Sequence, residues 1–255
     1  MSDLIIERLD SGVVLLRLNR PERRNAMNDA LLLDLLPSTF HELASDMSAR
    51  VIVLTGSGGS FCSGADLDTS GLAQPSPAES ELFMRTSHQT VLMMRSLPQP
   101  IIAAIDGHAV GAGIGLALAC DIRYGSATVK FSSPFLKLGL PPDWGTTYLT
   151  PAAVGTQRAL EIFLTGRVIE ANEAQQIGLI SRVCDDVLAD ALELAEQLAS
   201  NPPIATSATK RLVYGALDHD IRSAVLEHEV PTVALSLHSE EFKERFGVWV
   251  SKIRR

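Results

Sequence analysis

The sequence predicts an α/β fold in which a strand-rich N-terminal part precedes a helical C-terminal part. Short apolar runs at 4–9, 13–18, 51–54 and 101–105 have the length and composition of buried strands. A Gly-rich turn and a further apolar segment follow two of these runs, which indicates a loosely repeated strand–turn–helix unit. From Gly145 onward the apolar residues take helical spacing.

Turn and capping residues bound the first elements. Asp10–Gly12 predicts a hairpin between the first two strands. Asn28 is placed to cap a helix that reaches about residue 47, and Pro37 predicts a kink or break within it. The remaining predicted elements are an irregular loop at 68–80, a helix at 81–97, a pair of short strands near 122–124 and 129–131, and helices at 155–165, 171–178, 186–199, 204–216, 220–235 and 239–252.

Composition excludes several classes of function. The 255 residues are 46% hydrophobic and 20% charged, which is ordinary for a globular protein. The net charge of −8 argues against a general nucleic-acid binder. No apolar run approaches the roughly 18 residues of a membrane span, and the N-terminus has no signal-peptide pattern. Cys62, Cys120 and Cys184 lack metal-ligand spacing, so we expect a cytoplasmic, reduced protein without a metal site.

The stretch 101–121 is the most informative in the chain. A buried apolar run breaks at Asp106–Gly107, and Gly111, Gly113 and Gly115 then open a run of Leu and Ala. Backbone amides at the start of a helix have no intrahelical partner, and glycines let a ligand approach them closely. The sequence therefore predicts a site for an anion or an oxyanion.

Four interpretations of this turn compete. A dinucleotide fingerprint requires a third glycine that is missing at the correct spacing, and a phosphate loop requires a lysine that neither Gly-rich turn has. An oxyanion hole would need two amides from separate turns, whereas tight helix–strand packing would need the glycines alone. A second turn of similar build, at Phe61–Leu67, favours the oxyanion hole.

These two turns, in this order, resemble those of the enoyl-CoA hydratase/isomerase (crotonase) family, and the resemblance covers nearly the whole chain. It implies a ClpP-like spiral of ββα repeats over 1–199 and a helical region at 200–255 that builds homotrimers, often paired as hexamers. No cofactor is implied, because coenzyme A is part of the substrate. The other motifs that carry the resemblance are Asn19-Arg20-Pro21, Asn25-Ala26, Leu164-Thr165-Gly166, Ala174 and Gly178-Leu179-Ile180.

Carried over residue by residue, the resemblance assigns the two oxyanion donors to the backbone amides of Ala65 and Ala112. Such donors polarise a thioester carbonyl and stabilise the enolate that forms when an α-proton leaves. A basic cluster at Arg20–Arg24 would supply cationic contacts for coenzyme A, unless it is only a solvated face. The resemblance implies that backbone atoms hold the pantetheine and adenine around Arg24 and Ala26 and at Gly64, Asp66 and Leu67. The other expected substrate-binding positions are His108, Gly111 and Phe135. For His108, a packing role is an equal alternative.

The acid–base residues depart from the hydratase pattern. Gly115 and Phe135 stand where hydratases of the family carry their two glutamates. Asp143 instead falls on the catalytic aspartate of dienoyl-CoA isomerases and of the epoxide isomerases of phenylacetyl-CoA breakdown, with Pro141 stiffening the approach. The structural alternative is that Asp143 caps a helix that begins near Gly145.

His88 is a candidate of a different kind. It falls where aryl-CoA dehalogenases of the family place a histidine base, and Asp143 falls on their aspartate nucleophile. Phe135 replaces their active-site tryptophan, and a lone histidine on a helix also fits a structural or surface role.

The sequence therefore predicts an acyl-CoA isomerase in which Asp143 shuttles the proton, either shifting a double bond or rearranging a ring epoxide. A hydratase, a hydrolase or dehalogenase with Asp143 as nucleophile and His88 as base, and a non-catalytic CoA-binding protein are the alternatives.

Overall fold

The computed structural model describes residues 2–68, 76–216, 223–236, 240 and 242–245. Most of the predicted loop at 68–80, the start of the predicted helix at 220–235 and most of that at 239–252 lie outside the described residues. Within the described ranges, no helix has both the length and the apolar character needed to cross a membrane.

Nine strands form two sheets in the described part of the chain. The larger sheet has the order β1-β2-β3-β4-β6-β9, and only the β1–β2 pair is antiparallel. The smaller sheet has the order β5-β7-β8. The strands are β1 (Leu4–Arg8), β2 (Val13–Leu18), β3 (Val51–Gly56), β4 (Ile101–Ile105), β5 (His108–Val110), β6 (Ile122–Ser126), β7 (Lys130–Ser132), β8 (Val168–Glu170) and β9 (Arg182–Cys184).

The chain alternates between the two sheets, and this alternation produces the repeated unit. After β4 in the larger sheet it turns at Asp106–Gly107, adds β5 to the smaller sheet and then enters a helix. After β3 it passes through Cys62, which forms a parallel bridge with Ala109 of β5. The strand and Gly-rich turn of the predicted repeat are therefore confirmed in both segments, but only the second segment continues directly into a helix, since residues 57–68 form none.

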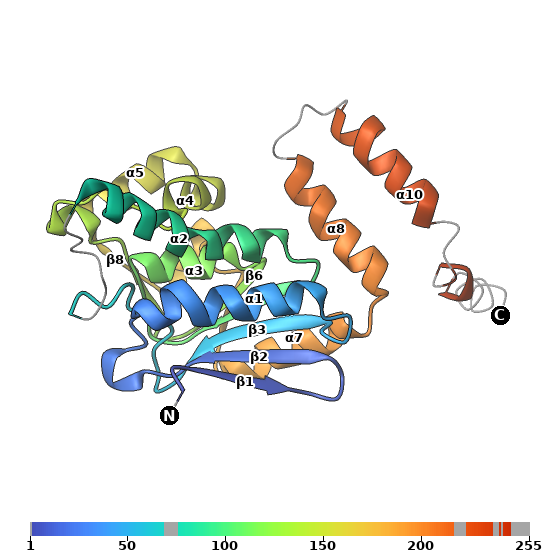
Figure 1. The fold of residues 1–255 in the computed structure, drawn as a ribbon, viewed down its shortest axis with the longest axis horizontal. Helices are drawn as coiled ribbons and strands as arrows, with labels where there is room; N and C mark the ends of the chain where they lie inside the picture. The colour runs from blue at the N-terminus through green and yellow to red at the C-terminus, as the bar shows by residue number, and fades with distance from the viewer. Residues whose placement is uncertain (1, 69–75, 217–222, 237–239, 241, 246–255) are drawn as a thin grey trace.

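Helices cover both faces of the larger sheet (Figure 1). Alternate side chains of its buried strands point to opposite faces, because side-chain direction in a strand has a period of two. One set, including Val53 and Ile102, packs on Ala191 and Ala195 of α7, and the other set packs on the side of α1, α2 and α3. The helices are α1 (Leu36–Ser45), α2 (Pro77–Ser96), α3 (Ala112–Ala119), α4 (Thr146–Val154), α5 (Thr156–Thr165), α6 (Ala171–Ile177), α7 (Val187–Ala199), α8 (Pro203–Ala216) and α10 (Val230–Ser236).

Capping explains where the first helices begin. The amide of Leu31 donates to Oδ1 of Asn28 at 3.1 Å, which confirms the predicted cap. The predicted break is confirmed as well, because a π-helical turn at Leu31–Leu35 precedes Pro37. α2 begins at Pro77 and not at residue 81, because Ser76 caps it through the amide of Glu79 at 3.3 Å.

Three short strands were not predicted, and one predicted relationship is wrong. The strands near 122–124 and 129–131 do form, but as β6 and β7 of different sheets, so they do not pair with each other. β5, β8 and β9 have three residues each, too few to produce a periodic pattern.

The C-terminal helices extend from one end of the core (Figure 1). Lys210 of α8 anchors them: its Nζ pairs with Oδ2 of Asp121 at 2.8 Å and donates to the carbonyl oxygens of Met94 and Gln99 at 3.1 and 3.0 Å. Burial lowers the pKa of Lys210, whereas Asp121 opposes that shift. The division at residue 200 and the assembly into trimers stay predictions.

Candidate active site

A largely apolar cavity brings together both predicted amide turns and Asp143. It encloses about 700 Å³ of empty space, part of it open to solvent. Among the described residues that line it, Asp143 is the only one with a titratable side chain. The lining residues are Leu32, Ser63, Gly64, Ala65, Leu67, Phe83, Met84, Ser87, Val110, Gly111, Ala112, Pro134, Phe135, Leu138, Leu140, Asp143 and Trp144.

The first amide turn is fixed by backbone hydrogen bonds on both sides of Ala65. The amide of Met27 donates to the carbonyl of Gly64 at 2.8 Å, and the amide of Asp66 donates to the carbonyl of Met27 at 2.9 Å. Gly64 has φ +98°, a conformation that a residue with a side chain rarely adopts. The turn thus holds Ala65 in place without using its amide.

The second amide turn places Ala112 at the start of α3. The amide of Gly111 donates to the carbonyl of Ser132 at 3.0 Å, which leaves Ala112 as the first residue of the helix. A Cβ added at Gly64 would lie 3.5 Å from the nitrogen of Ala112, so the two turns are in contact. Within the described residues, neither the Ala65 nor the Ala112 amide donates a hydrogen bond to the protein. Both are available to a ligand oxygen at the positive end of α3.

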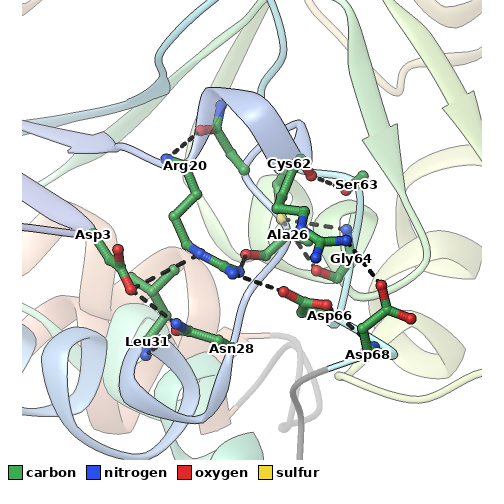
Figure 2. Close-up of polar contacts among 12 residues, drawn as sticks. Asp3, Arg20, Ala26, Asn28, Leu31, Cys62, Ser63, Gly64, Asp66 and Asp68 are labelled. Carbon is green, nitrogen blue, oxygen red and sulfur yellow. Dashed lines mark hydrogen bonds and ion pairs between the residues drawn. The ribbon is translucent and has the colours of Figure 1, made fainter.

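A buried ion pair lies behind the Ala65 turn (Figure 2). Nη2 of Arg20 contacts Oδ2 of Asp66 at 2.7 Å, and only 4% of the Asp66 side chain is exposed. Nη1 of Arg20 also donates to the carbonyl of Ala26 at 2.5 Å. Asp66 does not line the cavity, and Arg20 does not belong to an exposed basic face. The Asp66 side chain is therefore engaged by Arg20, and the expected contact of the Asp66 backbone with the substrate stays a prediction.

Asp143 presents a carboxylate oxygen without a protein donor. Its Oδ1 is buried and, within the described part of the chain, has no hydrogen-bond partner. The alternative that the Asp143 side chain caps α4 is wrong. Gly145 is the residue that precedes α4, no side chain caps this helix, and the backbone carbonyl of Asp143 accepts from the amide of Thr146 at 3.0 Å. The carboxylate itself is thus left for another partner.

Gly115 has no room for the glutamate that a hydratase would carry there. A Cβ at this position would lie 2.2 Å from the carbonyl oxygen of Trp144. Gly113, two positions earlier on α3, is equally close to the other half of the site, because its Cβ would lie 2.3 Å from the carbonyl oxygen of Cys62. The two glycines let α3 contact both halves of the site.

His88 contacts the Asp143 turn from α2. Its Nε2 accepts a hydrogen bond from the amide of Trp144 at 3.0 Å. The same nitrogen lies 3.8 Å from Oδ2 of Asp143, which is beyond hydrogen-bond distance. Because Nε2 accepts this hydrogen bond, it carries no proton to share with Asp143, and the His88–Asp143 contact is not an ion pair.

The other expected substrate-binding residues divide into two groups. Leu67, Gly111 and Phe135 line the cavity. Arg24, Ala26 and His108 do not line it, although the carbonyl of Arg24 accepts from the amide of Ser63 at 3.0 Å. Burial, reinforced by Arg24 and Lys130, lowers the pKa of His108.

The pocket was expected to be lined by the 68–95 region, but its individual residues were not named from the sequence. Phe83 and Met84 of α2 supply an apolar wall together with Leu138, and the spacing of Phe83, Ser87 and Val91 could have indicated the inner face of that helix. The Trp144–His88 contact has no local sequence signal. Over the described ranges there is no group of three or more His, Cys, Asp or Glu side chains that could hold a metal ion.

The two sheets, the repeated strand–strand–helix unit and the paired amide turns define a crotonase fold. A family model described as enoyl-CoA hydratase/isomerase matches residues 8–253. The chain belongs to the enoyl-CoA hydratase/isomerase family.

Its relatives carry names for several reactions. The chain is 40% identical over 246 residues to a "probable enoyl-CoA hydratase" of Mycobacterium leprae, covering 91% of this chain and 82% of that protein. It is 35% identical over 257 residues to the 1,2-epoxyphenylacetyl-CoA isomerase of Escherichia coli K12, covering 99% and 97%. A 4-chlorobenzoyl coenzyme A dehalogenase of an Arthrobacter species is 33% identical over 248 residues, covering 96% and 89%. Family membership therefore does not determine the reaction.

A solved structure supports the same assignment. The crystal structure of an enoyl-CoA hydratase from Bacillus anthracis superposes with a TM-score of 0.92 at 31% identity, covering 98% of this chain and 97% of that one.

Proposed function

We propose that this protein is an acyl-CoA isomerase that moves a proton with Asp143 while the amides of Ala65 and Ala112 hold the thioester oxygen. The observation that carries this proposal is the cavity itself, which is lined by two residues whose amides have no protein acceptor and, among the described lining residues, by one titratable side chain. A site of this kind can stabilise an enolate and transfer one proton.

The proposed reaction is a double-bond shift towards the thioester. The Asp143 carboxylate removes an α-proton from a β,γ-unsaturated acyl-CoA, and the electron pair of that C–H bond moves into a dienolate whose negative charge is on the thioester oxygen. Hydrogen bonds from the two amides stabilise this charge. The protonated Asp143 then returns its proton to the γ-carbon, which leaves a double bond between the α- and β-carbons. Ring-opening isomerisation of an epoxide would use the same enolate and the same proton carrier.

Hydration is disfavoured because it needs a second proton-transfer group. The positions at which hydratases of the family carry their glutamates hold Gly115 and Phe135, and the carbonyl of Trp144 fills the space where a side chain at Gly115 would begin. A nucleophilic route through Asp143 would need His88 as a base, yet its Nε2 already accepts from Trp144. Both observations support the isomerase.

The test is a comparison of Asp143→Asn with Asp68→Asn, using a β,γ-unsaturated hexenoyl-CoA and the absorbance of the conjugated product. Asp68 is the matched control, because it is a carboxylate near the Ala65 turn whose side chain is 72% exposed. We expect Asp143→Asn to lower turnover by at least about 100-fold, the usual loss for a missing proton-transfer group. Asp68→Asn should retain it. Equal turnover in the two variants would reject the role of Asp143.

A further inference from the structure

The turn that carries Asp143 has an unfavourable backbone conformation. Trp144 has φ +55° and Gly145 has φ +73°. The left-handed region is costly for a bulky residue such as tryptophan, because its Cβ approaches the following carbonyl. A turn of this kind persists only when surrounding contacts hold it.

Contacts from three elements hold this turn. The Trp144 side chain is 3% exposed, and its carbonyl oxygen packs against α3 at Gly115. Thr146 of α4 donates to the carbonyl of Asp143 through its amide at 3.0 Å and through Oγ1 at 2.6 Å. From α2, Nε2 of His88 accepts from the amide of Trp144 at 3.0 Å. The two rings also meet edge to face, with centroids 6.1 Å apart.

His88 lies close to the carboxylate. Its Nε2 accepts from the peptide group that joins Asp143 to Trp144, and the same nitrogen lies 3.8 Å from Oδ2 of Asp143. The lone pair of Nε2 accepts the hydrogen bond from the Trp144 amide, so this nitrogen is not free to take a proton from a substrate. Oδ1, the buried oxygen of Asp143, receives no donor from His88 or from any other described residue.

We propose that His88 is a positioning residue, which fixes the Asp143–Trp144 peptide group so that the carboxylate faces the substrate without a competing hydrogen-bond donor. This inference rests on the proposed function of Asp143. It assigns His88 a role different from that of a base, because the atom that matters is an acceptor at the Nε2 position and not a proton carrier.

The variants that separate these roles differ in where they place an acceptor. In His88→Gln the amide oxygen reaches approximately the place of Nε2 but cannot act as a base. In His88→Asn the side chain is too short to reach the Trp144 amide, and in His88→Leu it has no acceptor. Gln89→Leu is the matched control, because Gln89 is the adjacent exposed residue of α2.

The experiment measures kcat and KM for the β,γ-unsaturated hexenoyl-CoA, together with the thermal midpoint of each variant. We expect His88→Leu and His88→Asn to lose at least about tenfold in kcat with KM within about threefold, because a misplaced reacting group affects the transition state most. His88→Gln should stay within about threefold of the parent protein in kcat, since it restores the bond. Gln89→Leu should match the parent protein.

Each outcome decides between the roles. A loss in His88→Gln as large as that in His88→Leu would overturn the inference, because it would make the imidazole a proton carrier. Unchanged kcat in His88→Leu would overturn it too, by making the bond dispensable. If His88→Leu fails to fold, the comparison of His88→Gln with His88→Asn decides in the same way. A fully active Asp143→Asn would instead reject the proposed function, so the two failures are distinguishable.

Discussion

The two halves of the site are built on different principles. The amide half, at Gly64–Ala65 and Gly111–Ala112, presents main-chain groups and is fixed by backbone hydrogen bonds and glycine contacts. The carboxylate half presents the side chain of Asp143 on a turn with positive φ angles, which His88 and α3 hold in place. The amide half therefore tolerates a change of side chain wherever space allows, whereas the carboxylate half depends on the identity of single residues.

α3 connects the halves through two glycines. A Cβ at Gly113 would meet the carbonyl oxygen of Cys62 at 2.3 Å, and a Cβ at Gly115 would meet that of Trp144 at 2.2 Å. Each substitution should therefore disturb a different half.

The largest expected effects come from Gly113→Ala and Gly115→Ala. Gly115→Ala should lower turnover about 100-fold by displacing Asp143. The infrared carbonyl frequency of a bound thioester should stay lowered in this variant, because the two amides are unaffected. Gly113→Ala should lower turnover and also weaken that lowering of the carbonyl frequency, because the Cys62 segment leads into the Ala65 turn. Gly215→Ala, in α8 with no described atom within 4 Å of its added Cβ, is the control. Identical infrared spectra for the two site variants would show that the halves are not separable.

The next effect concerns the support behind the amide half. Asp66→Asn should lower the free energy of unfolding by up to about 3 kcal/mol, because it removes the close counter-charge of the buried Arg20 and leaves, among the described residues, only Asp3, at 3.9 Å. Asp68→Asn, which breaks the exposed pair with Arg23, should cost about 0.5 kcal/mol or less. Urea unfolding measures both. Similar urea midpoints for Asp66→Asn and Asp68→Asn would contradict the prediction that the buried ion pair stabilises the protein more than the exposed one.

A smaller effect should appear in the pH dependence of stability. Burial lowers the pKa of His108 below its ordinary 6.5. As the pH falls, the unfolded chain therefore binds a proton at His108 at a higher pH than the folded protein does. The free energy of unfolding should therefore decrease as the pH falls below about 6.5, until the folded-state pKa is passed. His108→Asn should make this decrease shallower, as measured by urea unfolding between neutral and mildly acidic pH. If the free energy of unfolding of His108→Asn decreased more steeply with falling pH than that of the parent protein, the prediction would be contradicted.

The sequence predicted the amide half better than the carboxylate half, for a physical reason. Gly64 and Gly111 mark positions where the backbone itself is used, and such positions leave a local pattern of glycines. The ion pair of Asp66 with Arg20 and the bond from Trp144 to His88 join residues 46 and 56 positions apart. Nothing local indicates those pairs, so the sequence predicted neither the Asp66 ion pair nor the His88 contact.

The fold shows the same division between local and distant information. The hairpin, the Asn28 cap and the break at Pro37 follow from residues close in sequence, and all three are confirmed. The placement of β6 and β7 in different sheets depends on how distant strands pair, which the sequence alone does not specify.

The central claim is that this site moves a proton and does not add water. The most direct measurement is mass spectrometry of the products formed in D₂O from a β,γ-unsaturated hexenoyl-CoA and from its conjugated isomer. We predict conjugated enoyl-CoA and no β-hydroxyacyl-CoA, with the isomerisation lost in Asp143→Asn. A proton that Asp143 returns directly leaves the product without deuterium, and exchange of the Asp143 carboxyl proton with D₂O before its return adds one deuterium. Accumulation of β-hydroxyacyl-CoA faster than isomerisation would contradict the account and identify the protein as a hydratase.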